Sequence, residues 1–401
     1  MKKSREQKEI QISLVLTNDW ELYGEGSGDF YNIQKKRLKD LLEIVERHRA
    51  KVSLFAEVGQ QWAHLKEGQK SPWAMNIARE WEKCVQETVS RGHDVQLHLH
   101  PTWQNSYHDG TKWKLNLNSW ALADLTPEKI EFELRRGREY LNGLGQSVNP
   151  SYRCVTFRAG AFCIQPATKT LSAIKRAGFL SDSSVVPGSW DYLYFDFRNI
   201  SMQTGPYFAN VDDLTPARED SQSTILELPI HTDQIWESPI IRRLLPGWVS
   251  LKWLFGINKD NRFLKWSKAR DRSIRDLSPI PDPLFKRRFL ARLSPANWLS
   301  YVVRKSTYVL DYDFIQPQLF TELIRRAAQK AKAKGIDEIV ILALGHANNS
   351  HTNENLDQIL QSLTKSFSEN LKFKTVQQVT EFYLNKKQLE QAPVKKWITH
   401  L

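Results

Sequence analysis

Hydrophobic positions along the chain alternate between two spacings. Residues 9–19 form a short run rich in β-branched and apolar residues, as do residues 51–58 and 94–100. Such runs predict buried strands. Between them, residues 33–49 and 71–92 carry apolar side chains at the spacing of an amphipathic helix. The first hundred residues therefore predict strands and helices in alternation.

The same alternation continues to the end of the chain. Thr126 and Pro127 have the residue types of an N-cap and a first helical position, so a helix is expected to begin there. Strands in β-α-β order imply a parallel sheet, and this length allows a closed barrel. The remaining expected elements are strands at 155–160, 181–186, 224–231 and 337–346, helices at 165–179 and 316–335, and two helices with a short extended link at the end.

Composition narrows the class of protein. Of the 401 residues 41% are hydrophobic, which is enough for a sizeable core. Three cysteines are too few for a disulfide framework, so we expect a reducing compartment. No uninterrupted apolar run reaches the roughly 18 residues of a membrane span, and the N-terminus has no apolar signal region. We therefore expect a cytoplasmic protein.

The formal net charge of +12 is concentrated in one segment. Residues 241–305 hold 16 Lys/Arg and 4 Asp/Glu, so 16 − 4 = +12, with Trp, Leu and Phe interleaved. We expect it to contact an anionic membrane at the inner face, or a lipid-linked glycan. The alternative is a helical subdomain with a solvated basic face. No nucleic-acid partner is expected, because no fold motif accompanies the charge. The expected domains are a barrel (1–235 and 313–401) and a basic insertion (236–312).

Polar residues stand where the predicted strands end. Functional side chains of parallel barrels gather at these carboxyl ends. In the stretch GHDVQLHLHP, His98 and His100 are two residues apart and share one face of a strand, as a chelating pair for a divalent ion would. His93 is out of phase with them, which favours a structural role. The other polar strand ends are Asp19, Arg158, Asp182, His231 and His346.

A third metal ligand is expected at the end of the first strand. Asp19 and Glu21 share a face if the backbone stays extended, while Trp20 points away. Two carboxylates permit a division of labour, in which one binds the ion and the other takes a proton from the attacking water.

The order of these motifs resembles the polysaccharide deacetylase (NodB-like, carbohydrate esterase family 4) superfamily. The segments that carry the resemblance lie within about residues 10–235 and 315–385. In chain order they are LTNDWE, GHDVQLHLHP, FRAGAF, AGFLSDSS and LALGHANNSH.

This resemblance implies a distorted (β/α)7 barrel and a bound divalent metal, with Zn²⁺ expected. It makes His98 and His100 ligands, Arg158 the residue that orients the base, and His346 the general acid. This chain departs from the family in its His-x-His spacing and in having Asp19-Trp20 in place of two adjacent aspartates. Asp19 is therefore either the metal ligand, with Glu21 or a remote acid as base, or the base, with Glu21 as ligand.

The implied substrate is an N-acetylated saccharide. We expect a hydrolase of amide bonds in cell-envelope or surface polysaccharide biosynthesis. The alternatives are an inactive barrel that acts as a glycan-binding or membrane-associated scaffold, and an amidohydrolase-type metal enzyme. Aromatic faces stack on sugar rings. The expected substrate contacts are Trp20, Trp103, Asp182, His231 and Asn348.

Overall fold

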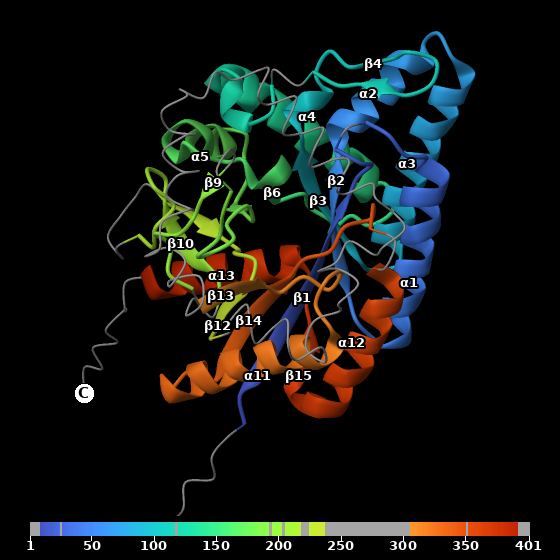
Figure 1. The fold of residues 1–401 in the computed structure, drawn as a ribbon. Coiled ribbons are helices and arrows are strands. Elements are labelled where there is room, and N and C mark those ends of the chain that lie inside the picture. Colours follow the sequence, from blue (N-terminus) through green and yellow to red (C-terminus); the bar gives the residue numbers. More distant parts are fainter. Residues whose placement is uncertain are drawn as a thin grey trace, which may run out of the picture.

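The fold is α/β, with a large, mostly parallel sheet and helices outside it (Figure 1). The computed structural model describes residues 9–24, 26–116, 119–191, 195–202, 205–217, 224–236, 305–349 and 352–391. Most of the basic segment lies outside the described residues, and so do the predictions that concern it.

The central sheet has the strand order β10-β11-β7-β6-β3-β2-β1-β14, and β15 also pairs with β1. Every pair in it is parallel except β10–β11. Its strands are β1 (Gln11–Trp20), β2 (Val52–Glu57), β3 (Asp94–Leu99), β6 (Thr156–Ala159), β7 (Ser181–Asp182), β10 (Tyr207–Asn210), β11 (Thr224–Glu227), β14 (Glu338–Ala343) and β15 (Leu371–Phe373).

The two ends of this sheet meet. Ile230, just beyond β11, forms a parallel bridge with Leu342 of β14. The Ile230 amide donates to the Val185 carbonyl at 3.0 Å, and the His231 amide donates to the Leu342 carbonyl at 2.9 Å. Strands β1, β2, β3, β6, β7, β11 and β14 thus follow one another around a ring of seven, as the family resemblance implied.

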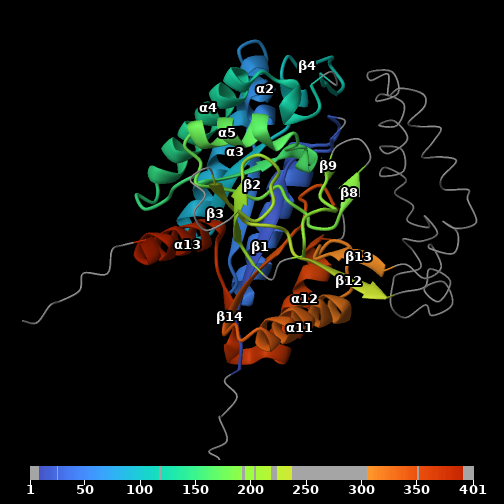
Figure 2. The ribbon, with the colours of Figure 1, turned by 90° about the vertical axis from the view of Figure 1, so that its left-hand side faces the viewer.

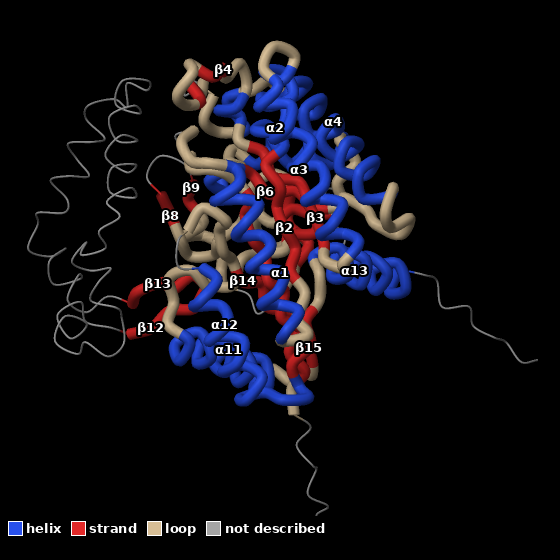
Figure 3. The backbone as a smooth tube through the Cα atoms, turned by 90° about the vertical axis from the view of Figure 1, so that its right-hand side faces the viewer, coloured by secondary structure: helices blue, strands red, loops and turns tan. Residues whose placement is uncertain are grey.

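Helices cover the outside of the strands (Figures 2 and 3). None of the described helices is long and apolar enough to cross a membrane. The helical segments are η1 (Phe30–Lys36), α1 (Arg37–Arg47), α2 (Val58–Gly68), α3 (Pro72–Ser90), η2 (Pro101–Trp103), η3 (Leu122–Asp124), α4 (Pro127–Gln146), η4 (Gly160–Phe162), α5 (Ala167–Arg176), α11 (Pro317–Ala333), α12 (Thr352–Phe367), η5 (Ser368–Asn370) and α13 (Val376–Gln391).

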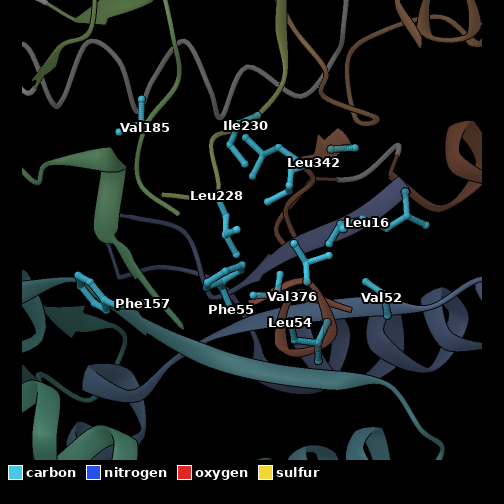
Figure 4. Packing of buried hydrophobic residues seen from close by; sticks show 14 of the residues in the cluster. Leu16, Val52, Leu54, Phe55, Phe157, Val185, Leu228, Ile230, Leu342 and Val376 are labelled. Carbon is cyan, nitrogen blue, oxygen red and sulfur yellow. The ribbon is translucent and has the colours of Figure 1, made fainter. Parts of the chain in front are cut away.

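The core lies on both faces of the central strands. Strand β2 is buried along its whole length, and β1 is buried from its second residue on. Strands covered on both faces read as continuous apolar runs instead of alternating ones. Leu16, Phe55, Phe157 and Ile230 belong to one cluster that joins neighbouring strands (Figure 4). Burial of each such side chain contributes roughly 1.5–3 kcal/mol to folding.

Within the described residues, three two-stranded ribbons accompany the ring: β4 (Tyr107–His108) with β5 (Trp113–Lys114), β8 (Trp190–Asp191) with β9 (Phe195–Asp196), and β12 (Thr232–Trp236) with β13 (Lys305–Val309). The last pair is antiparallel, and Trp236 is the register partner of Lys305. The chain therefore leaves for residues 237–304 and returns from them at adjacent points.

Candidate active site

The carboxyl ends of β1, β2 and β3 bring together a group of side chains that could hold a metal ion. One potential ligand atom from each of its members lies within 4.8 Å of the others. The Glu21 carboxylate lies 2.9 Å from Nε2 of His100 and 3.6 Å from Nε2 of His98. The predicted imidazole pair thus meets Glu21. The members of the group are Glu21, Glu57, His98 and His100.

Both imidazoles are held with Nε2 toward this group. Nδ1 of His98 lies 3.0 Å from the Arg158 carbonyl, which can only accept, so Nδ1 carries the proton and Nε2 is free to bind a cation. Nε2 of His100 is buried and has no hydrogen-bond partner of proper geometry. The His100 ring packs on Gly160, where an added Cβ would come within 2.4 Å of it. This contact explains the glycine of the FRAG motif.

Two buried glutamines fix the backbone on either side of Glu21. Gln34 Nε2 donates to the Trp20 carbonyl at 3.2 Å, and the Leu22 amide donates to Gln60 Oε1 at 3.2 Å. The two glutamines bond each other at 2.5 Å. Burial would raise the pKa of Glu21, but the adjacent imidazoles of His100 and His98 outweigh it and hold that pKa well below its usual range.

Glu57, the last residue of β2, is a member of the group that the sequence did not predict. Its carboxylate accepts the amide of Gly59 at 2.7 Å and that of His100 at 2.6 Å. Burial, together with repulsion from Glu21, outweighs the attraction of His100 and raises the pKa of Glu57 to about 8. A single glutamate at the end of a strand forms no sequence pattern. Its burial and its hydrogen bonds in the structure identify Glu57 as part of the site.

Asp19 lies with Arg158. The Arg158 Nη1 contacts Asp19 Oδ1 at 2.5 Å, and both side chains are buried. Arg158 Nη2 also donates to Thr17 Oγ1 at 3.1 Å and to Ser183 Oγ at 3.0 Å. The guanidinium lies over the Phe55 ring, 3.8 Å from its centre. These contacts fix the orientation of the guanidinium, which in turn fixes the orientation of the Asp19 carboxylate.

His346 reaches Asp19 from the end of β14. The distance from His346 Nε2 to Asp19 Oδ2 is 3.9 Å. Asp313 accepts the His346 amide at 2.7 Å and lies 3.3 Å from Nδ1. Burial would lower the pKa of His346, but the bond to Asp313 and the charges of Asp19 and Asp311 raise it to about 10. Asp311 and Asp313 fall at the predicted domain boundary, and no motif pointed to them.

The expected substrate contacts are mostly buried. Trp20 is fully buried between Phe30 and Trp81, and Trp103 is 7% exposed, so neither indole presents a face to a sugar, which corrects that expectation. Asp182 and His231 are also buried, and Asp182 bonds Ser184. Asn348 is partly buried, and its side-chain amide donates to the Leu22 carbonyl at 3.2 Å.

Comparison with known proteins finds similarity among solved structures alone: no protein-family model and no curated protein matches the chain. A protein from Mycobacterium smegmatis named as a polysaccharide deacetylase is 12% identical with a TM-score of 0.44, over 96% of this chain and 93% of that one. The family 4 carbohydrate esterase of Streptomyces lividans is 9% identical with a TM-score of 0.36, over 92% and 94%.

A further similar structure is the 4-alpha-glucanotransferase of Thermococcus litoralis, 12% identical with a TM-score of 0.43, over 94% of this chain and 40% of that one. Polysaccharide deacetylases are thus among the solved structures that resemble this chain, as the motifs indicated. Proteins with other activities resemble it as well. Function therefore has to be argued from the residues of this chain.

Proposed function

We propose that the protein is a metal-dependent hydrolase that removes an N-acyl group, typically acetyl, from a sugar. The observation that supports this most is the convergence of two groups at one barrel end. One group contains two imidazoles and the Glu21 carboxylate. The other is the buried Asp19–Arg158 pair beside His346. A cation site next to a base and an acid is what amide hydrolysis requires.

The residues present fit a divalent cation. Imidazole and carboxylate ligands suit zinc. The buried His100 Nε2 makes no hydrogen bond, and a bound cation would give it a partner. In this proposal His98, His100 and Glu21 hold the ion. A zinc ion there would polarise the amide carbonyl and lower the pKa of the attacking water.

Asp19 is the proposed base, and Glu21 is the proposed ligand. The contacts that favour this alternative are the bond of Asp19 to Arg158 and the contacts of Glu21 with both imidazoles. Arg158 holds the Asp19 carboxylate in the orientation in which it would accept the proton of water.

His346 is the proposed acid that protonates the departing amine. It is protonated at neutral pH because of its acidic neighbours, which raise its pKa to about 10. Asp313 accepts from Nδ1 and so directs Nε2 toward the space beside Asp19. The proposed proton acceptor and the proposed proton donor are thus 3.9 Å apart at their closest oxygen and nitrogen atoms.

The proposed substrate is an N-acetylated saccharide of cell-envelope or surface polysaccharide synthesis, either free or lipid-linked. The basic segment 241–305 is the proposed contact with an anionic inner membrane face. In keeping with these partners, we propose a cytoplasmic protein that associates peripherally.

The test is acetate release from N-acetylated chito-oligosaccharides by metal-free and zinc-loaded protein. We expect activity only with metal, and a loss of at least 100-fold in H98A and H100A. The matched control is H48Q, since His48 follows the last residue of α1 and pairs with Asp357 of α12. Absence of both metal binding and acetate release in the wild-type protein would contradict the proposal and leave the inactive-barrel alternative.

A further inference from the structure

The cation site holds a second carboxylate that neither the motifs nor the resemblance supplies. Glu57 comes from β2, between the strands that carry Glu21 and the two histidines. We infer that Glu57 is a positioning residue of the cation site, which fixes the backbone of His100 and the start of α2. This inference rests on the cation site of the proposed function.

The bonds of Glu57 tie three parts of the site together. One oxygen caps α2 by accepting the Gly59 amide at 2.7 Å, and the other accepts the His100 amide at 2.6 Å. Glu57 is also the register partner of His98 across β2 and β3. A shift of this carboxylate would therefore move both the start of α2 and the backbone that carries the imidazoles.

The position of Glu57 argues that it does more than cap a helix. The side chain is fully buried, so both of its oxygens face protein groups. One Glu57 oxygen also lies within 4.8 Å of the ligand atoms of Glu21, His98 and His100. The Glu57 carboxylate therefore borders the cation site while it holds the His100 amide.

The experiment is calorimetric titration of Zn²⁺ into the metal-free full-length protein. We expect E57Q, which keeps the size of the side chain but replaces one of the two accepting oxygens by an NH2 group, to bind Zn²⁺ about 10–100-fold more weakly. The matched control is D94N. Asp94 is equally buried at the opposite end of neighbouring β3 and bonds Ser53 and Gln96, so its loss should leave Zn²⁺ affinity unchanged.

A second variant keeps the charge and displaces it. An added Cβ at Gly59 would lie 2.7 Å from Glu57 Oε1, so G59A should also weaken Zn²⁺ binding. Thermal unfolding of each metal-free variant separates general destabilisation from loss of the site. Wild-type protein that binds no Zn²⁺ overturns the proposed function itself. Wild-type binding with E57Q and G59A unchanged, or with D94N equally weakened, overturns only the role of Glu57.

Discussion

Single buried charges define this barrel end, and each has an identifiable partner. Arg158 is fully buried, yet it bonds Asp19, Thr17 and Ser183. Breaking such a pair leaves a charge buried alone, whereas removing both partners does not. The energetic cost of a substitution here depends on which charge remains.

A double-mutant cycle on Asp19 and Arg158 measures this dependence. We expect R158M to lower the free energy of unfolding by about 3–5 kcal/mol, because Asp19 then stays buried without its partner. The double variant D19N/R158M should be more stable than R158M, although both lack activity. Guanidinium denaturation of the metal-free proteins provides the free energies, and additive effects of the two substitutions would contradict the expectation.

A second buried pair, Asp182 and Glu227, should make stability fall as pH rises. Burial raises the pKa of Asp182 to about 6, and burial with the charge of Asp182 raises the pKa of Glu227 well above its usual value. The folded protein therefore holds protons that the unfolded chain releases above about pH 4. The stability from this pair is complete below about pH 4 and is lost through pH 6 and above.

The variant E227Q isolates this effect. It removes one titrating group and the repulsion that acts on Asp182, so its free energy of unfolding should fall less than that of the wild type between pH 4.5 and 7.5. Other groups, such as the buried His231 with a pKa lowered to about 4, contribute equally to both proteins. Urea denaturation at several pH values provides the comparison; parallel curves would exclude the pair as the cause.

At the scale of elements, the sequence predicted most strands and helices but missed α2. The helix begins within one residue of β2, and it buries Gln60, Gln61 and His64. A helix is predicted from the spacing of its hydrophobic residues, so a helix that buries polar residues shows no clear helical pattern in the sequence. The predicted helix at 33–49 is real, although its first part is the π-helical η1.

The sequence likewise predicted some residues of the site and missed others. His98 and His100 carry a period-two signal at the end of one strand, and the structure brings them together. Glu57 and Asp313 come from other strands and from the return of the basic segment. The fold brings Glu57 and Asp313 to the site, and no spacing of residue types along the sequence indicates this.

Two glycines of α4 give opposite predictions within one helix. An added Cβ at Gly143 meets nothing within 4 Å, whereas one at Gly137 would lie 2.8 Å from Leu97 of β3. We expect G143A to stabilise the protein by about 0.5–1 kcal/mol through helix propensity, and G137A to destabilise it by about 1–3 kcal/mol through overpacking. Denaturant unfolding of both variants measures the sign, and stabilisation by G137A would contradict the close packing of α4 on β3.

At the scale of the whole molecule, the basic segment is an insertion in the chain that interrupts no strand of the ring. The segment leaves and returns through β12 and β13, which pair with each other. Asp233 of β12 anchors this ribbon to the barrel by bonding Arg326 and Lys330 of α11. The ribbon therefore has its own attachment, independent of residues 237–304.

A deletion tests this separation. Replacing residues 238–303 by a short glycine-containing turn should preserve the ribbon, because Trp236 and Lys305 are register partners. We expect a thermal midpoint within a few degrees of that of the full-length protein and a loss of sedimentation with anionic vesicles at low salt. Neutral vesicles are the control. Undiminished binding by the deletion variant would place the membrane contact elsewhere.

The return of the chain from the ribbon has a consequence for communication within the protein. Strand β13 ends at Val309, and four residues later Asp313 bonds His346. Leu310 and Tyr312 are hydrogen-bonded to the backbone of Leu344 on the way, so this connection has little freedom to absorb movement. A movement of the ribbon would therefore be passed on to the His346 imidazole, and we expect a partner bound to residues 237–304 to alter proton transfer by His346.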